Sequence, residues 1–437
     1  MPSMMRCVSI LVLAALAAVA ATAQQPMMVN IQKGSDARIP VAVPPFATAD
    51  AGLRAAAEEM AQTVADDLLF AGVFAIIPRE MYPPTYTGFT SDLKSIDFPA
   101  WRAAGAQNLV YGLVLQEGGQ LVGQFRLFDL VSNNQVYGQE VRVAQGSQRL
   151  AAHRFSEEVI RYLDATAGAG TSEIVFTGIT GKTKEIYVAD YDGANAKKLT
   201  DHGSVSIKPK VSPDGNQIAY LSYKDRYSFL YVLDRRTGKS TVLSKEVGLN
   251  SSPSWSPDGK RLAMTLSKDG NTEIYLRNPD GSNPVRLTRN KDGDTSPCFS
   301  PDGSKIVFVS DRAGKPNIFL MDADGGNQAR ISFHGGNAYD PTWSPDGKRI
   351  AFVSEVKGEG FEIYVMGPDG SGATQLTNSN GINESPSWSP DSRHVIFSSN
   401  RGGASALFAV NVTTGQETRI PKMTVPGEGP SWGPRRR

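Results

Sequence analysis

A series of related segments along the second half of the chain constrains the fold more than any other feature of the sequence. Each segment has a proline, one variable residue and an apolar residue, followed in five of six copies by Ser-Pro-Asp-Gly or Ser-Pro-Asp-Ser. The apolar residue recurs at intervals of 44, 44, 44, 45 and 44 residues, at Val211, Trp255, Phe299, Trp343, Trp388 and Trp432. A fixed period of this length indicates a repeat architecture.

Each repeat contains only strand and turn signals. Proline at the second position of Ser-Pro-Asp-Gly favours a type I turn between two strands. A second turn, rich in Gly, Asp and Asn, joins two further strands, as in residues 273–288. Four short strands in a period of 40 to 50 residues are typical of a β-propeller blade. Because a lone four-stranded sheet leaves both faces uncovered, we expect the blades to stack in a ring with the tryptophans between them.

The phase of the repeat predicts how the ring closes. The repeat region opens near Glu173 with the second, third and fourth strands of a blade, and the chain ends in "VPGEGPSWGPRRR", a first strand with nothing after it. These two fragments complete one blade, so residues 172–437 are predicted to form an all-β six-bladed propeller closed by pairing of its terminal strands. Closure also removes exposed sheet edges. An open β-solenoid, the alternative, would not require complementary fragments.

The front third of the chain has no repeat and is predicted to be an α/β domain over residues 35–165. A Gly/Ala-rich linker, 166–171, is expected to join it to the propeller. Periodicity predicts helices at 53–71 and 147–165, a short helix at about 98–105, and strands at 37–46, 73–77, 108–116, 120–130 and 135–143.

The first 23 residues have the pattern of a secretory signal peptide. Arg6 precedes an apolar run over residues 8–20, and Ala21-Thr22-Ala23 offers a cleavage site before Gln24. The run is too short to span a bilayer; a buried N-terminal helix is the alternative. Residues 24–34 precede the first clear strand and are predicted to be a mobile partner-binding segment.

Motifs for catalysis, cofactors or metals are missing from the sequence. There is no G-x-S-x-G nucleophile motif, since the segment around Ser405 lacks its last glycine, and no histidine has another four residues away. Cys298, alone after removal of the leader, is expected to be a buried or half-buried strand residue. A formal charge of +1 disfavours nucleic acid as a partner, and Arg435–Arg437 is read as a solvated tail. A binding protein without cofactor or metal is therefore predicted; a propeller hydrolase or lyase is the alternative.

The segments just before each Pro-x-Trp motif lead into the strand nearest the propeller axis, so they are expected to line one mouth of the channel. They differ more between repeats than the turns do, as expected of positions that contact a partner. Asp340 and Glu384 are expected to occupy equivalent places. These segments contain Gly248–Ser252, Asp292–Ser296, Asn337, Asp340, Asn383 and Glu384.

The order of parts resembles the TolB family of periplasmic propeller proteins. The resemblance rests on the leader, "IPVAVPPF", "DDLLFAGVF", "AHRFSEEVIRYL", "VADYDGAN" and the repeats. It implies a monomeric, non-enzymatic adaptor of the Tol–Pal envelope system, which supports outer-membrane integrity and constriction during cell division. It also implies two partners, the lipoprotein Pal at the propeller mouth and TolA at the N-terminal segment.

The resemblance and the mouth segments together give candidate contact residues. The Pal site is expected at Leu249, Ser252, Thr295, Asn337, Asp340, Asn383 and Glu384. Alternating polar and apolar side chains after the leader suit a strand added to a partner's sheet. The TolA site is therefore expected at Met28, Val29, Asn30, Ile31 and Gln32.

Overall fold

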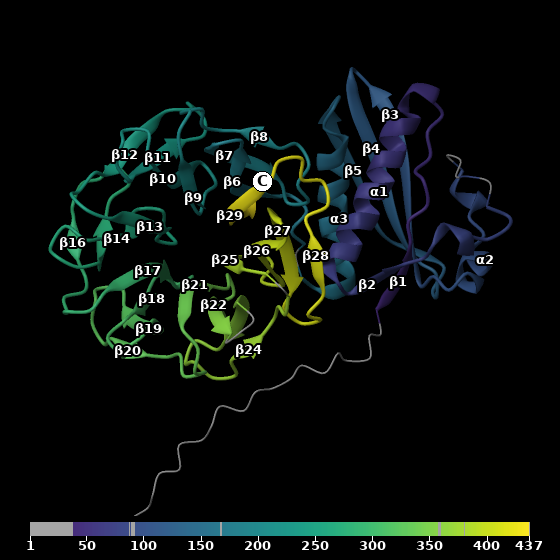
Figure 1. Cartoon of the computed structure of the whole chain (residues 1–437). Coiled ribbons are helices and arrows are strands. Elements are labelled where there is room, and N and C mark those ends of the chain that lie inside the picture. The colour runs from purple at the N-terminus through teal and green to yellow at the C-terminus, as the bar shows by residue number, and fades with distance from the viewer. Residues whose placement is uncertain are drawn as a thin grey trace, which may run out of the picture.

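The computed structural model describes residues 38–436, apart from 87, 89–91, 167, 357–359 and 380. It has an N-terminal α/β domain beside a ring of six four-stranded sheets (Figure 1). The fold class predicted from the repeat is confirmed. The predicted signal peptide and the 24–34 segment lie outside the described residues. Among the helices that are described, none combines the length and apolar character needed to cross a membrane.

The N-terminal domain is built on a five-stranded sheet in the order β2-β1-β3-β4-β5. The first two strands pair in parallel, β1 also pairs in parallel with β3, and the last three form an antiparallel meander. The strands are β1 (Ile39–Ala42), β2 (Phe74–Ile76), β3 (Asn108–Glu117), β4 (Gln120–Asp129) and β5 (Asn134–Ala144).

Two long helices, α1 (Arg54–Ala71) and α3 (Gln148–Asp164), cover one face of this sheet. Leu68 of α1, Phe155 of α3 and Phe125 of β4 are almost completely buried between the helices and the sheet. The two phenylalanine rings stack with their centres 4.7 Å apart. The other face packs against α2 (Phe98–Ala103) through Trp101. Short 3-10 helices lie at Ala51–Leu53, Arg79–Met81 and Leu93–Ser95.

The propeller blades follow the 44-residue period. We number them 1 to 6 in chain order of their innermost strands. Blade 1 is β9 (Ser206–Val211), β10 (Gln217–Ser222), β11 (Phe229–Asp234) and β12 (Ser240–Ser244); blade 2 is β13 (Asn250–Trp255), β14 (Leu262–Leu266), β15 (Glu273–Arg277) and β16 (Val285–Arg286); blade 3 is β17 (Asp294–Phe299), β18 (Lys305–Ser310), β19 (Asn317–Asp322) and β20 (Ala329–Arg330). Blade 4 is β21 (Ala338–Trp343), β22 (Ile350–Val356), β23 (Gly360–Met366) and β24 (Thr374–Gln375); blade 5 is β25 (Asn383–Trp388), β26 (His394–Gly402), β27 (Ala404–Asn411) and β28 (Glu417–Arg419).

Blade 6 is assembled from both ends of the repeat region, as predicted. Its inner strand, β29 (Gly427–Arg435), pairs antiparallel with β6 (Ser172–Thr180), and β7 (Thr183–Asp190) and β8 (Lys197–Lys198) complete the sheet. Trp432 lies opposite Ile174 in this pairing. The C-terminal strand therefore joins the blade that the propeller segment begins, and this closes the ring.

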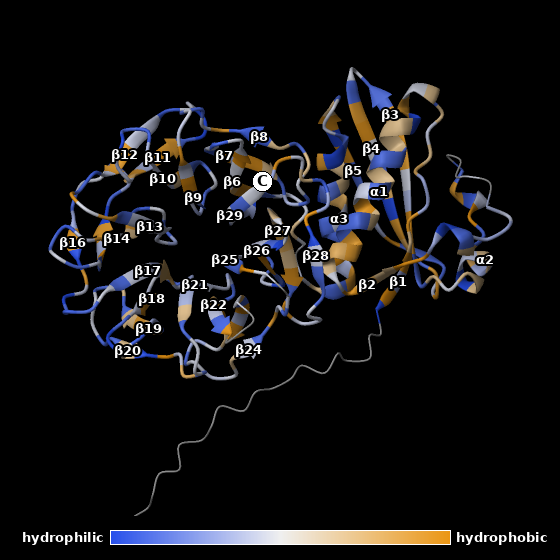
Figure 2. Cartoon of the chain, viewed as in Figure 1, coloured by the Kyte–Doolittle hydropathy of each residue, from blue (hydrophilic) through white to orange (hydrophobic). Residues whose placement is uncertain are grey.

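Tryptophans join neighbouring blades, as their recurrence predicts. Trp255 Nε1 donates to the Lys210 carbonyl of blade 1 at 2.9 Å, and Trp388 Nε1 donates to the Thr342 carbonyl of blade 4 at 3.0 Å. Apolar strand centres fill the layers between sheets, while polar residues gather in the loops (Figure 2). The indole N–H of Trp255 and that of Trp388 thus keep a partner while the rings are buried, which is the usual requirement for tryptophan in a core.

The expectation of a solvated arginine tail is wrong for Arg435 and Arg436, which are held by the folded chain; Arg437 lies outside the described residues. Arg435 Nε donates to the Gly168 carbonyl at 2.7 Å, and the Arg436 guanidinium donates to Asp190 at 2.6 Å. The segment read as a linker is itself packed, because Thr171 is 3% exposed and its N–H and hydroxyl both donate to the Glu157 carboxylate at 2.8 Å. The end of the chain therefore clamps the propeller to the segment that joins the two domains.

Candidate functional site

The six inner strands share one irregularity near the start of each strand. In every blade the residue before the proline and the proline itself stand opposite a single residue of the second strand, which is a β-bulge. The pre-proline residue has a left-handed backbone, with φ between 45° and 56°. Left-handed non-glycine residues are costly and concentrate at functional sites. The six are Lys208, Ser252, Ser296, Asp340, Ser385 and Gly429.

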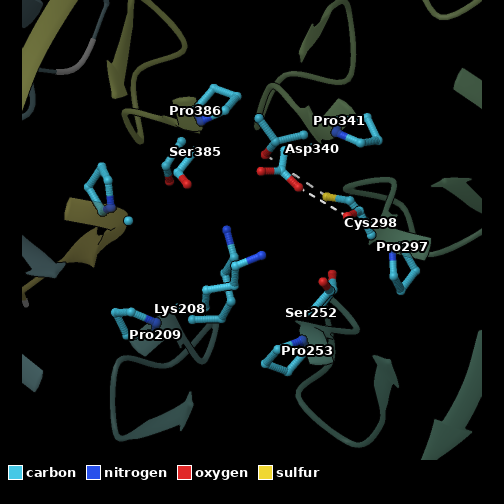
Figure 3. A pocket seen from close by; sticks show the side chains of 17 residues that line it. Lys208, Pro209, Ser252, Pro253, Pro297, Cys298, Asp340, Pro341, Ser385 and Pro386 are labelled. Carbon is cyan, nitrogen blue, oxygen red and sulfur yellow. Dashed lines mark hydrogen bonds between the residues drawn. The ribbon is translucent and has the colours of Figure 1, made fainter. Parts of the chain in front are cut away.

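These six residues, which we call the pre-proline ring, line the central channel with the prolines and the residues that follow them. The channel holds a cavity of about 140 Å³. Figure 3 shows Lys208, Ser252, Asp340 and Ser385 projecting toward this common space. Ser296 Oγ donates to Asp340 Oδ1 at 3.0 Å, a contact between neighbouring blades 3 and 4. The backbone is thus nearly sixfold, whereas the side chains are not.

Charges of both signs meet in the channel. Burial lowers the pKa of the Lys210 ammonium. The nearby Lys208 lowers this pKa further, whereas Cys298 and Asp340 raise it. Partial burial at the mouth raises the pKa of Glu384, and the neighbouring Asp340 and Glu428 carboxylates add to the effect. The charged side chains are therefore close enough to act on one another across the channel.

The loops around this mouth expose large apolar side chains. Eight large apolar residues of the described propeller are exposed, and six of these lie in the loops that lead into inner strands or join second to third strands at the mouth. The other two, Val242 and Val285, lie on outer strands. We call the six the apolar rim: Tyr223, Tyr227, Val247, Leu249, Phe333 and Ile382. Large apolar side chains exposed together at one end of a protein mark a candidate interaction surface.

The described part of the N-terminal domain packs at the opposite end of blades 5 and 6 and does not cover the mouth. Phe70 of α1 stacks on His394, at the start of β26, with ring centres 4.1 Å apart. It also packs 5.0 Å from Tyr191, which follows β7. Both contacts lie at the strand ends remote from the pre-proline ring.

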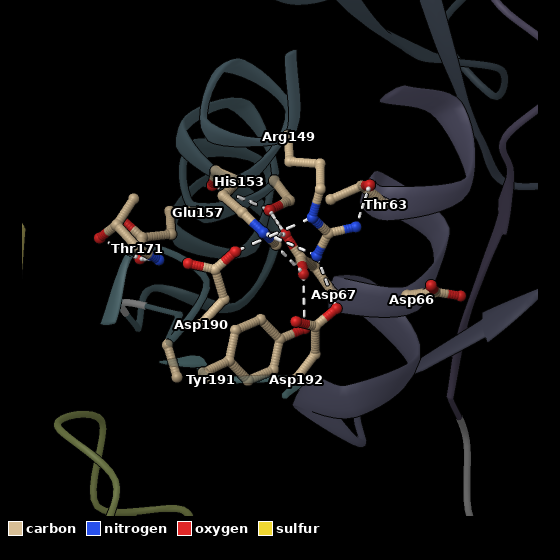
Figure 4. A network of polar contacts seen from close by, with 12 residues as sticks. Thr63, Asp66, Asp67, Arg149, His153, Glu157, Thr171, Asp190, Tyr191 and Asp192 are labelled. Carbon is tan, nitrogen blue, oxygen red and sulfur yellow. Dashed lines mark hydrogen bonds and ion pairs between the residues drawn. The ribbon is translucent and has the colours of Figure 1, made fainter. Parts of the chain in front are cut away.

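A buried polar cluster centred on Asp67 joins the domains (Figure 4). The Asp67 carboxylate accepts from the Tyr191 hydroxyl at 2.5 Å and from Ser156 Oγ, and it lies 2.8 Å from His153 Nδ1. Burial alone would lower the pKa of His153, but Asp67 outweighs it and the pKa is raised. Every group here has a partner inside the protein, so the cluster is a structural joint.

One connector runs between this joint and the mouth. Lys422 Nζ lies 3.4 Å from Asp66 of α1 and 2.9 Å from Asp192. Five residues later the chain enters β29 at Gly427, and Glu428 faces the mouth, where Lys184 Nζ pairs with it at 2.5 Å. Residues 422–428 thus touch both the N-terminal domain and the channel.

The comparisons with known proteins agree with this architecture. Residues 162–436 match the family model described as "TolB beta propeller domain", and residues 27–136 match "TolB amino-terminal domain". The chain belongs to the TolB family.

A solved TolB family structure, from Acinetobacter baumannii, superposes with a TM-score of 0.82 at 27% identity and covers 93% of this chain and 99% of that one. Among curated relatives, "Tol-Pal system protein TolB" of Dinoroseobacter shibae is 36% identical over 204 residues, 45% of each chain. The same-named protein of Desulfosudis oleivorans is 38% identical over 221 residues, 49% of this chain and 50% of that one. The chain thus aligns with about half the length of these curated TolB relatives.

The residues predicted for the mouth of this TolB family member lie at different depths. Ser252 and Asp340 belong to the pre-proline ring, Leu249 is on the apolar rim, and Thr295 and Glu384 precede ring residues. Two others are held by neighbouring side chains, Asn337 within blade 4 and Asn383 of blade 5 by a residue of blade 4. Asn337 donates to Glu355 at 2.6 Å, and fully buried Asn383 donates to Glu362 at 2.6 Å.

The expected equivalence of Asp340 and Glu384 is wrong. The bulge and positive φ place Ser385 at the position of Asp340, so Glu384 corresponds to Tyr339. The extra residue in the 45-residue interval precedes the proline and shifts the count by one. Counting back from each proline finds the whole ring, including Lys208 of blade 1, a blade for which the prediction named no mouth segment.

The described residues hold no group of three or more acidic, histidine or cysteine side chains placed to bind a metal. Cys298 is half-buried on β17, as predicted, with Sγ 4.0 Å from the Thr342 hydroxyl. Ser405 Oγ donates to the Gly427 carbonyl at 2.9 Å and is therefore occupied in joining blades 5 and 6.

Proposed function

We propose that this chain is a periplasmic adaptor of the Tol–Pal envelope system, with no enzymatic activity, that binds the lipoprotein Pal at the propeller mouth. Its role is to support outer-membrane integrity and constriction during cell division. Curated relatives carry the name "Tol-Pal system protein TolB". The observation that carries the proposal is the apolar rim around the charged channel, which the N-terminal domain leaves uncovered.

A mouth of this kind suits a protein partner better than a small substrate. Aromatic and aliphatic side chains at an uncovered rim supply the apolar area that a protein interface buries. The channel beneath is narrow and lined by prolines and hydroxyls, so a partner loop can enter it while flanking residues rest on the rim. Leu249, Ser252, Thr295, Asn337, Asp340, Asn383 and Glu384 remain the candidate Pal contacts; we assign the direct contacts to those that face the mouth.

We further propose that TolA binds the N-terminal segment, residues 24–34, with Met28, Val29, Asn30, Ile31 and Gln32 forming the added strand. Two partners then bind at separate places on one monomer, which is what an adaptor requires. Residues 422–428 offer a path between them, because they touch both α1 and the mouth. Any coupling must be reciprocal: if Pal changes TolA affinity, TolA changes Pal affinity equally.

The Pal assignment is tested with a charged obstruction. Ser252→Arg together with Thr295→Arg introduces two guanidinium groups into the contact surface, which should weaken Pal binding by about 100-fold or more because unpaired interfacial charges are costly. The matched control is Thr237→Arg, an exposed residue in the turn after β11 at the other end of the propeller. Calorimetric titration with the Pal protein of the same genome, without its lipid, measures both. Equal affinities for the two variants would place the Pal site elsewhere.

The TolA assignment is tested by deleting residues 24–34. Loss of TolA binding is expected with Pal binding intact or tighter and with an unchanged melting temperature of the propeller. Undiminished TolA affinity in the deleted protein would refute the segment as the TolA site.

A further inference from the structure

The pre-proline ring carries opposite charges on opposite sides. Lys208 belongs to blade 1 and Asp340 to blade 4, which face each other across a six-bladed ring. The remaining positions are three serines and a glycine. A ring that is nearly sixfold in backbone therefore has no rotational symmetry in charge, because it has one positive and one negative pole.

Residues next to the pre-proline ring add charged groups at both poles. Lys210, deeper in blade 1, adds a second ammonium beside Lys208. Glu384 of blade 5, beside Asp340, adds a carboxylate that is exposed at the mouth. Glu428 of blade 6 is already paired with Lys184 at 2.5 Å and contributes little net charge.

The polar groups at the two poles keep bonding capacity for a partner. Within the described part of the chain, no cation pairs with the Glu384 carboxylate and no carboxylate pairs with the Lys208 ammonium. Among the described residues, the Asp340 carboxylate accepts a hydrogen bond only from the Ser296 hydroxyl, at 3.0 Å. A carboxylate pair with open acceptor positions matches a guanidinium or ammonium group, and a lone ammonium matches a carboxylate.

We propose that this charge asymmetry sets the rotational orientation of Pal on the mouth, with a lysine or arginine of Pal between Asp340 and Glu384 and an acidic side chain of Pal facing Lys208. The inference rests on the proposed function. A propeller mouth offers six similar docking angles, since its backbone repeats every blade. Charge complementarity selects one, because rotation away from it separates the opposite charges, and a half-turn brings like charges together.

The test neutralises each pole without changing shape. Asp340→Asn keeps a residue type that tolerates the left-handed backbone and can still accept from Ser296, and Glu384→Gln lies outside the strained position. Lys208→Met neutralises the other pole. We expect each substitution to weaken Pal binding about fivefold to tenfold and to flatten its dependence on salt, because fewer complementary charges then attract across the interface.

The controls are Lys260→Met and Asp324→Asn, exposed residues in turns at the other end of the propeller. A Pal variant with its basic contact side chain reversed to glutamate should bind Asp340→Lys better than it binds the unmodified chain. That exchange of preference is expected only if the two charges meet.

Two results would overturn the orientation proposal. One is unchanged affinity and salt dependence in Asp340→Asn, Glu384→Gln and Lys208→Met. The other is tighter binding by Asp340→Asn, which would mean that an acidic group of Pal faces Asp340. If the Ser252→Arg, Thr295→Arg protein still loses binding in either case, the mouth remains the Pal site and the charge proposal alone fails. If that protein binds Pal normally, the proposed function fails as well.

Discussion

The two ends of the propeller are formed by loops that connect the same strands, but the loops at one end differ in character from those at the other. At the end that faces the N-terminal domain, the turns satisfy themselves: Ser256 Oγ donates to Asp258 at 2.6 Å, and the hydroxyls and N–H of Ser300 and Ser304 hold the pKa of Asp302 at about 2. At the mouth, Lys208 projects into the channel, and Glu384 and the apolar rim residues are exposed. Regular turns build the ring, while irregular loops at the other end are free to recognise a partner.

The same contrast applies to buried charge. The Asp67 carboxylate is enclosed between α1, α3 and the turn after β7, where it accepts from Tyr191 and Ser156 and pairs with His153. The channel is open, and its charges act on one another through space. We therefore expect substitutions at the domain-facing end to change stability and those at the mouth to change binding.

Removing residues 425–437 should have the largest effect. The deletion takes away the inner strand of blade 6 and the Arg435–Arg436 clamp, so β6 becomes an exposed edge. Trp432→Ala alone should cost about 3–5 kcal/mol, because its ring is 7% exposed and its Nε1 donates to Ser172 at 2.7 Å. Denaturant unfolding measures both. A truncated protein that melts at the parent temperature would disprove closure by the terminal strand.

Asp67→Ala should cost about 3 kcal/mol of stability and leave Pal affinity unchanged. It removes the acceptor shared by His153, Ser156 and Tyr191 and leaves buried donors without a partner. Unfolding and Pal titration on one preparation separate the two effects. A large loss of Pal affinity at unchanged stability would break the contrast between the ends.

Acidification should destabilise the domain-facing end through His394. Burial lowers the pKa of His394 to about 4, whereas the unfolded chain protonates near about 6.5. The unfolded state therefore binds the proton first, so stability is fully present above about pH 6.5 and falls as the pH drops toward 4, by an amount on the order of 3 kcal/mol. His394→Gln should remove that part of the decline. The measurement is the loss of unfolding free energy between pH 7 and pH 4.5 in the parent protein and in the His394→Gln variant. An equal loss in both proteins would contradict the assignment.

The smallest effect is expected at the rim. Leu249→Ser removes one apolar side chain that is 39% exposed, so stability should change by no more than about 0.5 kcal/mol. Pal affinity should fall a few-fold, because part of the apolar contact is lost. Val285→Ser, on an outer strand, is the control, and an equal loss of affinity in both variants would count against the rim.

The propeller could be predicted because its information is local and repeated. Turn residues, strand lengths and the spacing of the Pro-x-Trp motif recur in each repeat. The incomplete first and last repeats predict how the ring closes. The arginine clamp could not be predicted, since Arg435 binds the Gly168 carbonyl, and a backbone acceptor has no sequence signature. The Asp67 cluster also could not be predicted from the sequence, because its residues lie on α1, α3 and the turn after β7 and come together only when the two domains pack.

The mouth could be predicted from the sequence only in part. Its position followed from the strand order, and Ser252 and Asp340 were found there, but a one-residue insertion displaced Glu384. Lys208 was missed because no mouth segment was predicted for blade 1. The left-handed ring itself is a property of the bulged backbone. A proline at each copy indicates a break in the ladder, and only the paired strands show where the preceding side chain points.

Amide hydrogen exchange with and without Pal reports on both ends of the propeller in one experiment, so it tests whether the mouth is the binding surface. We expect Pal to slow exchange in the segments entering the inner strands, such as 204–208, 248–252 and 292–296. Unchanged exchange is expected in the turns at the other end, such as 212–216 and 256–260. Protection confined to those turns or to the N-terminal domain, with none at the mouth, would contradict the assignment of the mouth as the binding surface.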